Sequence, residues 1–130
     1  MAAHPMAKAY RESFDAMMRG DPEPMHKLTW PDAVLHFPGQ TPLSGDIRGW
    51  DETMRWAQRF FERVGRTYGE EVVSVVADDE WAFMLTRYHA ERNGRKVQDQ
   101  SVNVCRLREG RIAETWVLVG DSKVFQEVFG

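Results

Sequence analysis

The sequence contains a single cysteine, Cys105, so no disulfide can form within the chain and no zinc site can be built from several cysteines. It has no apolar run near the ~20 residues that a membrane-spanning helix needs. Residues 1–5 lack the basic region and the apolar core of a signal peptide. These absences favour a cytoplasmic protein without a membrane partner.

The sequence also lacks clustered positive charge. The net charge is −3, and lysine and arginine occur singly or in pairs, which argues against nucleic acid as a partner. No two histidines stand four positions apart with a carboxylate between them, so we expect no metal site. The Gly-x-Gly-x-x-Gly phosphate loop and the Gly-x-Ser-x-Gly nucleophile elbow are absent, so we expect no cofactor.

What remains is a chain of 130 residues, 42% of them hydrophobic, which is enough for one core and one domain over residues 1–130. Apolar residues at helical spacing predict helices over 6–17 and 51–64, the second with Asp51 as its N-cap, and a short helix at 25–28. A short buried strand at 33–35 precedes His36. The second half predicts an antiparallel meander of strands at 71–77, 81–92, 96–108 and 111–119, with Asn93-Gly94 as a tight hairpin turn.

The segment His36-Phe37-Pro38-Gly39-Gln40-Thr41-Pro42-Leu43-Ser44-Gly45 places an imidazole at the end of an apolar strand, before a Gly/Pro loop and an amphipathic helix. This order resembles the SnoaL-like branch of the NTF2-like, ketosteroid-isomerase-type family. Residues 112–116, Ile-Ala-Glu-Thr-Trp, also look like the last strand of SnoaL-like proteins. The resemblance covers residues 7–119. It implies an α+β cone in which three N-terminal helices pack on a curved, mainly antiparallel sheet.

The resemblance also implies site residues. With the Pro-x-Ser-Gly end of the loop in register, His36 takes the place of the isomerases' proton-shuttling aspartate. With Gly94-Arg95-Lys96 in register, Asn103 takes the place of their protonated, oxyanion-binding aspartic acid. The family's tyrosine on the first helix has no direct match, because Ser13 and Phe14 are nearest and Tyr10 lies one turn earlier. Asp121 stands where SnoaL-like cyclases often carry an acidic residue near the pocket mouth, which would make it a second acid/base. The alternative for Asp121 is a C-terminal turn or cap.

Strand alternation puts Asp99, Ser101, Asn103 and Cys105 on one face of a strand. Gln98 and Gln100 make the opposite face polar too, so this row can face either a pocket or water. If the row faces a pocket, Thr86 on the preceding strand also points inward. The catalytic candidates are then His36, Asn103, Asp99 and Asp121. The candidates for substrate contact are Tyr10, Phe14, Trp30, Trp56, Phe60, Tyr88, Ser101, Thr115 and Val117.

These residues predict a cofactor-independent enzyme, an isomerase, polyketide cyclase or dehydratase, acting on a hydrophobic carbonyl compound. A neutral His36 would remove a proton next to the carbonyl, and Asn103, helped by Tyr88 or Tyr10, would bind the enolate oxygen. The alternative for His36 is a strand-end histidine hydrogen-bonded to its own loop.

Two other functions stay open. One is a non-catalytic small-molecule binder or dimeric scaffold with the same fold. The other is an epoxide hydrolase, which needs two aspartates bridged by an arginine, whereas Asp99 is the only inward candidate and Arg87 lies on the other strand face. A homodimer is expected by resemblance, because Phe83 and Leu85 make the second face of the sheet apolar as well.

Overall fold

The structure, a computed structural model, describes residues 3–130. In chain order its elements are α1 (Pro5–Met18), α2 (Glu23–Leu28), β1 (Thr29–Phe37), β2 (Gly45–Arg48), α3 (Trp50–Val64), β3 (Gly69–Ala77), β4 (Trp81–Arg92), β5 (Arg95–Arg108), β6 (Arg111–Val119) and α4 (Ser122–Phe129). Within the described range no helix is long and apolar enough to cross a membrane.

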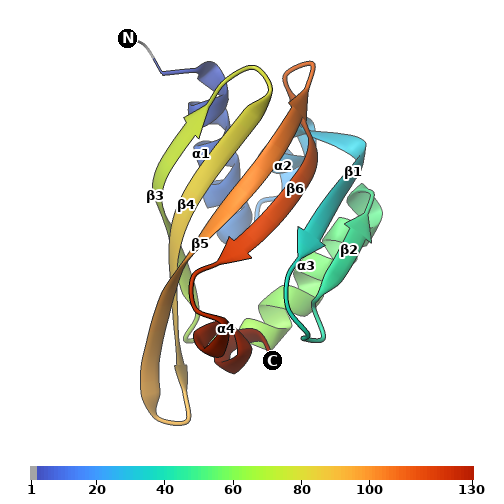
Figure 1. The fold of residues 1–130 in the computed structure, drawn as a ribbon. Coiled ribbons are helices and arrows are strands. Elements are labelled where there is room, and N and C mark those ends of the chain that lie inside the picture. Colours follow the sequence, from blue (N-terminus) through green and yellow to red (C-terminus); the bar gives the residue numbers. More distant parts are fainter. Residues whose placement is uncertain (1–2) are drawn as a thin grey trace.

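The strands form one six-stranded sheet in the order β2-β1-β6-β5-β4-β3 (Figure 1). Every neighbouring pair is antiparallel except β1 and β6, which run parallel. Helices α1, α2 and α3 lie along one face, and α4 lies below the end of β6 (Figure 1). This arrangement confirms the α+β prediction with three N-terminal helices on a mainly antiparallel sheet.

Two elements were not predicted from the sequence, β2 and α4. Strand β2 pairs through Gly45 and Asp46 with the end of β1, so the Gly/Pro segment is a hairpin connection. Helix α4 begins after Asp121, whose carboxylate accepts hydrogen bonds from the backbone nitrogens of Lys123 and Val124. Asp121 is therefore the N-cap of an additional helix.

The turns and helix ends follow local chemistry. Asn93 and Gly94 have φ angles of 53° and 76°, as the predicted two-residue hairpin requires. Helix α3 starts one residue earlier than predicted, with Gly49 as its N-cap and Asp51 in its first turn. The prediction of Asp51 as N-cap was wrong, but its carboxylate still faces the positive end of the helix dipole.

The two faces of the sheet differ in what covers them. On the inner face, Val72, Thr86, Ser101 and Val119 form a row across β3, β4, β5 and β6 beneath the helices. The outer face carries a row across all six strands, made of Val76, Phe83, Val104, Trp116, His36 and Asp46. Val76 and Phe83 are 60% and 41% exposed, as is the neighbouring Leu118 at 55%.

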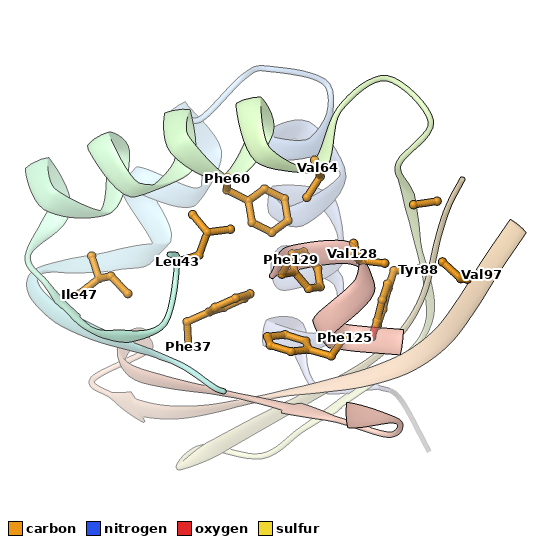
Figure 2. Close-up of a cluster of buried hydrophobic side chains, with 11 residues drawn as sticks. Phe37, Leu43, Ile47, Phe60, Val64, Tyr88, Val97, Phe125, Val128 and Phe129 are labelled. Atoms are coloured by element: carbon orange, nitrogen blue, oxygen red, sulfur yellow. The ribbon is translucent and has the colours of Figure 1, made fainter. Parts of the chain in front are cut away.

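The main core lies between α3, α4 and the inner face of the sheet. Figure 2 shows Phe37, Phe60, Phe125 and Phe129 turned toward a common space, with Tyr88 beside Phe129. Phe37 meets Phe125 and Phe129 with ring centroids 5.5 Å away in each case, which is within the range of favourable aromatic pairs. The C-terminal helix thus closes one end of the cone with two phenylalanines.

Candidate functional site

A cavity of about 190 Å³ lies between the helices and the inner face of the sheet. Its lining is mostly apolar. The helices contribute methionine and aromatic side chains, among them Phe14, Met54, Trp56 and Phe60. The indole nitrogen of Trp56 donates to the Leu43 carbonyl oxygen at 2.9 Å, which fixes this wall against the loop between β1 and β2.

Polar side chains from β5 and α1 also line the cavity. On β5 the alternation is as predicted, and Ser101 and Asn103 both point inward and line the cavity. Asn103 is 8% exposed. Tyr10 reaches the same region from α1, and burial first, then the neighbouring Cys105 thiol, raises the pKa of its hydroxyl well above 10.0. Tyr10 therefore stays protonated, and it can donate a hydrogen bond to a ligand.

Among the described residues that line the cavity, one carries a carboxyl group, Glu70 on β3. The Tyr68 hydroxyl donates to one of its oxygens at 2.5 Å, and the Thr86 hydroxyl donates to the other at 2.6 Å. Thr86 is in turn 2.7 Å from the Ser101 hydroxyl. Because the Thr86 proton is used toward Glu70, Ser101 donates to Thr86, and a chain of hydroxyls connects β5 to the carboxyl group.

Burial raises the pKa of Glu70 above the usual 4.5, while the hydrogen bonds from Thr86 and Tyr68 act in the opposite direction and moderate the effect. A carboxyl group whose pKa is raised in this way is a stronger base, once it is ionised, than a surface glutamate. Burial likewise raises the pKa of Tyr68, with Glu70 as the second cause. Glu70 is thus a carboxyl group in a mostly apolar cavity, held in place by the neutral hydroxyl groups of Tyr68 and Thr86.

Sequence reasoning missed Glu70 because the strand was started at residue 71. The structure starts β3 at Gly69, and the alternation that points Val72 inward then points Glu70 inward as well. The available signal was an acidic residue in phase with an inward apolar position of the following strand.

Most of the predicted contact residues do line the cavity: Tyr10, Phe14, Trp56, Phe60, Tyr88, Ser101, Thr115 and Val117. Trp30 does not. Its indole nitrogen donates to the Arg108 carbonyl oxygen at 2.7 Å, and the guanidinium of Arg111 lies 4.3 Å from the ring centre. Thr29 points into the cavity, so its neighbour Trp30 on the same strand points away.

His36 also lies outside the cavity, contrary to the expectation that it shares one with Asn103. Leu35 and Phe37 line the cavity, and alternation along β1 turns His36 to the outer face of the sheet. There its ring stacks on Trp116, with centroids 5.3 Å apart. Its Nδ1 is 2.7 Å from Asp46 Oδ1 and its Nε2 is 2.5 Å from Glu114 Oε2.

We expect this arrangement to make stability depend on pH. Burial by itself lowers the pKa of His36, but the hydrogen bonds to Glu114 and Asp46 outweigh it and raise the pKa above 6.5. The stabilisation is therefore fully present below the unfolded-state pKa and is lost as pH rises through the folded-state value. Urea unfolding of the wild type and His36→Gln at about pH 6 and pH 9 measures this, with the larger difference expected at the lower pH. A difference that does not change with pH would contradict it.

The remaining acidic candidates have structural partners. Asp99 accepts hydrogen bonds from the Tyr88 hydroxyl at 3.0 Å and from the Asp121 backbone nitrogen at 2.8 Å. Burial first, then the hydrogen bond to Asp99, raises the pKa of Tyr88. The Tyr88 hydroxyl is therefore already engaged, contrary to the expectation that it helps bind an enolate. Among the described residues that line the cavity there is no aspartate and no arginine, so the epoxide hydrolase set is not assembled there.

Over residues 3–130, no group of three or more histidine, cysteine, aspartate or glutamate side chains is placed to hold a metal ion.

The model of the SnoaL-like domain matches residues 10–115 of the sequence. The chain belongs to the SnoaL-like family. This confirms the resemblance seen in the loop after β1 and in the last strand. No curated protein sequence matches the chain.

Solved structures share the fold of this SnoaL-like domain at low sequence identity. Bal32a, from a soil-derived mobile gene cassette, is 22% identical over 95% of both chains, with a TM-score of 0.83. TerC, co-crystallised with polyporic acid, is 16% identical over 96% of this chain and 98% of its own, with a TM-score of 0.79. A proposed SnoaL-like polyketide cyclase from Jannaschia sp. CCS1 is 13% identical over 98% and 96%, with a TM-score of 0.73.

Proposed function

We propose that this SnoaL-like domain is a cofactor-independent acid/base enzyme, an isomerase, polyketide cyclase or dehydratase that acts on a hydrophobic carbonyl compound in the cavity. The observation that carries the proposal is Glu70, a carboxyl group facing a mostly apolar cavity with a raised pKa. Carboxyl groups with a raised pKa in such cavities are typical of general acids and bases. Glu70 takes the part that the sequence had suggested for His36.

In the proposed reaction, the Glu70 carboxylate removes a proton from the carbon next to the substrate carbonyl. The electron pair of that C–H bond moves toward the carbonyl oxygen, and the Asn103 amide donates a hydrogen bond to the resulting enolate oxygen. Asn103 follows Ser101 on the same face of β5, about 7 Å further along the strand. Because Ser101 is connected to Glu70 through Thr86, the base and the amide flank one stretch of the cavity. Return of the proton to another carbon completes an isomerisation.

The first test is exchange of the proton next to the carbonyl of β-tetralone, a ketone with two fused rings, in D₂O, followed by NMR. We expect the wild-type protein to accelerate exchange and Asn103→Leu to slow it by about 10²–10³, the usual effect of removing one oxyanion donor. Ligand binding without exchange would contradict the proposed reaction and favour the non-catalytic binder of the same fold.

The proposal includes a homodimer formed through the outer face of the sheet. The exposed Val76, Phe83 and Leu118 support it, because a monomer would leave this apolar surface in water. We expect a dimer at micromolar concentration by sedimentation velocity, and a monomer for Phe83→Glu. Gln58→Glu adds the same charge on α3 and should leave the dimer intact. A monomeric wild-type protein would contradict this part of the proposal.

A further inference from the structure

The part of the lining that the structure describes carries no positive charge. Among the described residues that line it, Glu70 is the only acidic side chain, and there is no lysine, arginine or histidine. An anionic ligand would lose its hydration in the cavity and find no positive group to compensate its charge. It would also be repelled by the Glu70 carboxylate, so both effects oppose its binding.

The Glu70 carboxyl group is also not arranged as an open site for a cation. Each of its oxygens already accepts a hydrogen bond at 2.6 Å or less, one from Tyr68 and the other from Thr86. A ligand ammonium would therefore compete with these hydroxyl groups for the carboxylate oxygens, whereas an uncharged ligand leaves both hydrogen bonds in place. These contacts favour an uncharged ligand in the cavity.

The size of the cavity limits the ligand further. An apolar cavity of about 150 Å³ is enough for benzene, whereas pockets for drug-sized ligands begin at about 300 Å³. The cavity described here, at about 190 Å³, lies near the lower end of this interval. Phe37, Phe60 and Phe129 are among its lining residues, and their rings pack against one another (Figure 2). They form an aromatic wall, which suits a flat ring compound.

We infer that the cavity selects an uncharged, compact ligand of one or two fused rings and excludes both ionised homologues and four-ring compounds. This inference concerns binding, and it rests on the charge of the lining residues and on the volume of the cavity. Only the assignment of the ligand as a carbonyl compound rests on the proposed function, since the carbonyl oxygen is the group that Asn103 would meet.

Calorimetric titration with ligands of one skeleton tests the charge. β-Tetralone is neutral, aminotetralin is a cation and tetralin carboxylate is an anion near pH 7.5. We expect β-tetralone to bind at least ten times more tightly than either charged homologue. Comparable or tighter binding of the amine would show that Glu70 recognises a cation, and comparable or tighter binding of the carboxylate would show a positive site. Either result, or no binding of β-tetralone at all, would overturn the inference.

The same titration with the steroid enone androstenedione tests the size, and we expect no measurable binding. Binding of the steroid as tight as that of β-tetralone would overturn the size limit. A matched pair of variants on α3 locates the ligand. Ala57→Phe fills part of the cavity and should abolish β-tetralone binding, whereas Gln58→Phe, at the adjacent exposed position, should retain it. Equal binding by both variants would place the ligand elsewhere and overturn the inference.

Binding and chemistry can fail separately. If β-tetralone binds with the expected selectivity but its proton does not exchange, the inference stands and the proposed reaction fails. If exchange occurs and the amine or the carboxylate binds equally well, the reaction stands and the inference fails.

Discussion

Glu70→Gln should lower the rate of β-tetralone proton exchange by about 10²–10⁴, the range that a positioned general base contributes. Glutamine keeps the size of the side chain and can still hydrogen-bond to Tyr68 and Thr86, but it cannot accept the substrate proton. The measurement is the initial exchange rate by NMR at saturating ketone. In the wild type this rate should rise with pH as Glu70 ionises, with a midpoint above the usual 4.5, and the variant should lose this titration.

Glu71→Gln is the matched control, because Glu71 is the next residue on β3 and its side chain is 68% exposed beside Arg87. It should exchange β-tetralone at the wild-type rate. Wild-type activity in Glu70→Gln would reject Glu70 as the base.

The effect of Glu70→Gln on stability separates a catalytic from a structural role. A carboxyl group with a raised folded-state pKa destabilises the protein as pH rises through that value, because the unfolded chain ionises more easily. The variant should therefore be as stable as the wild type or more stable at neutral pH. Loss of activity together with a large loss of stability would indicate a structural role instead.

Phe37→Ala should lower the free energy of unfolding by about 3–5 kcal/mol, the usual cost of truncating a buried phenylalanine. Phe37 is 7% exposed, and its ring packs against Trp56 from α3 and against Phe125 and Phe129 from α4. The truncation removes contacts that join the sheet to both helices. It also leaves an empty space beside the cavity, which adds to the loss of stability. Urea unfolding followed by circular dichroism measures the change.

Phe61→Ala is the control for this prediction. Phe61 belongs to α3 and is 39% exposed, so its loss should cost clearly less than that of Phe37. Equal effects of the two substitutions would mean that the aromatic cluster around Phe37 does not stabilise the fold in particular.

Some features of the site were readable from the sequence because they depend on local periodicity. The alternation on β5 correctly placed Ser101 and Asn103 on one face, although the sequence left open whether that face meets the cavity. Helical spacing on α3 brought Trp56 and Phe60 to the cavity. The Asn93-Gly94 turn fixed the β4–β5 register, because both residues adopt positive φ.

The wrong predictions arose where the ends of a strand were placed incorrectly, because the ends set which residues alternate toward the cavity. Too few residues of β1 were assigned to the strand for its phase to be read, and His36 was placed on the wrong face as a result. Its neighbours Leu35 and Phe37 face the cavity, and alternation at this end of the strand leaves His36 with Asp46 and Glu114 on the other side. The prediction that Trp30 lines the cavity was wrong for the same reason.

By itself, the sequence determined the α+β class, the SnoaL-like family and the alternation that puts Ser101 and Asn103 on one face of β5, since these follow from periodicity, turn residues and motif order. Only the tertiary structure decided which titratable group belongs to the cavity. Glu70 meets Thr86 through the pairing of β3 with β4, and His36 meets Glu114 through the parallel pairing of β1 with β6. Such pairings join residues far apart in the chain, and the burial that raises the pKa of Glu70 exists only after the helices have closed over the sheet.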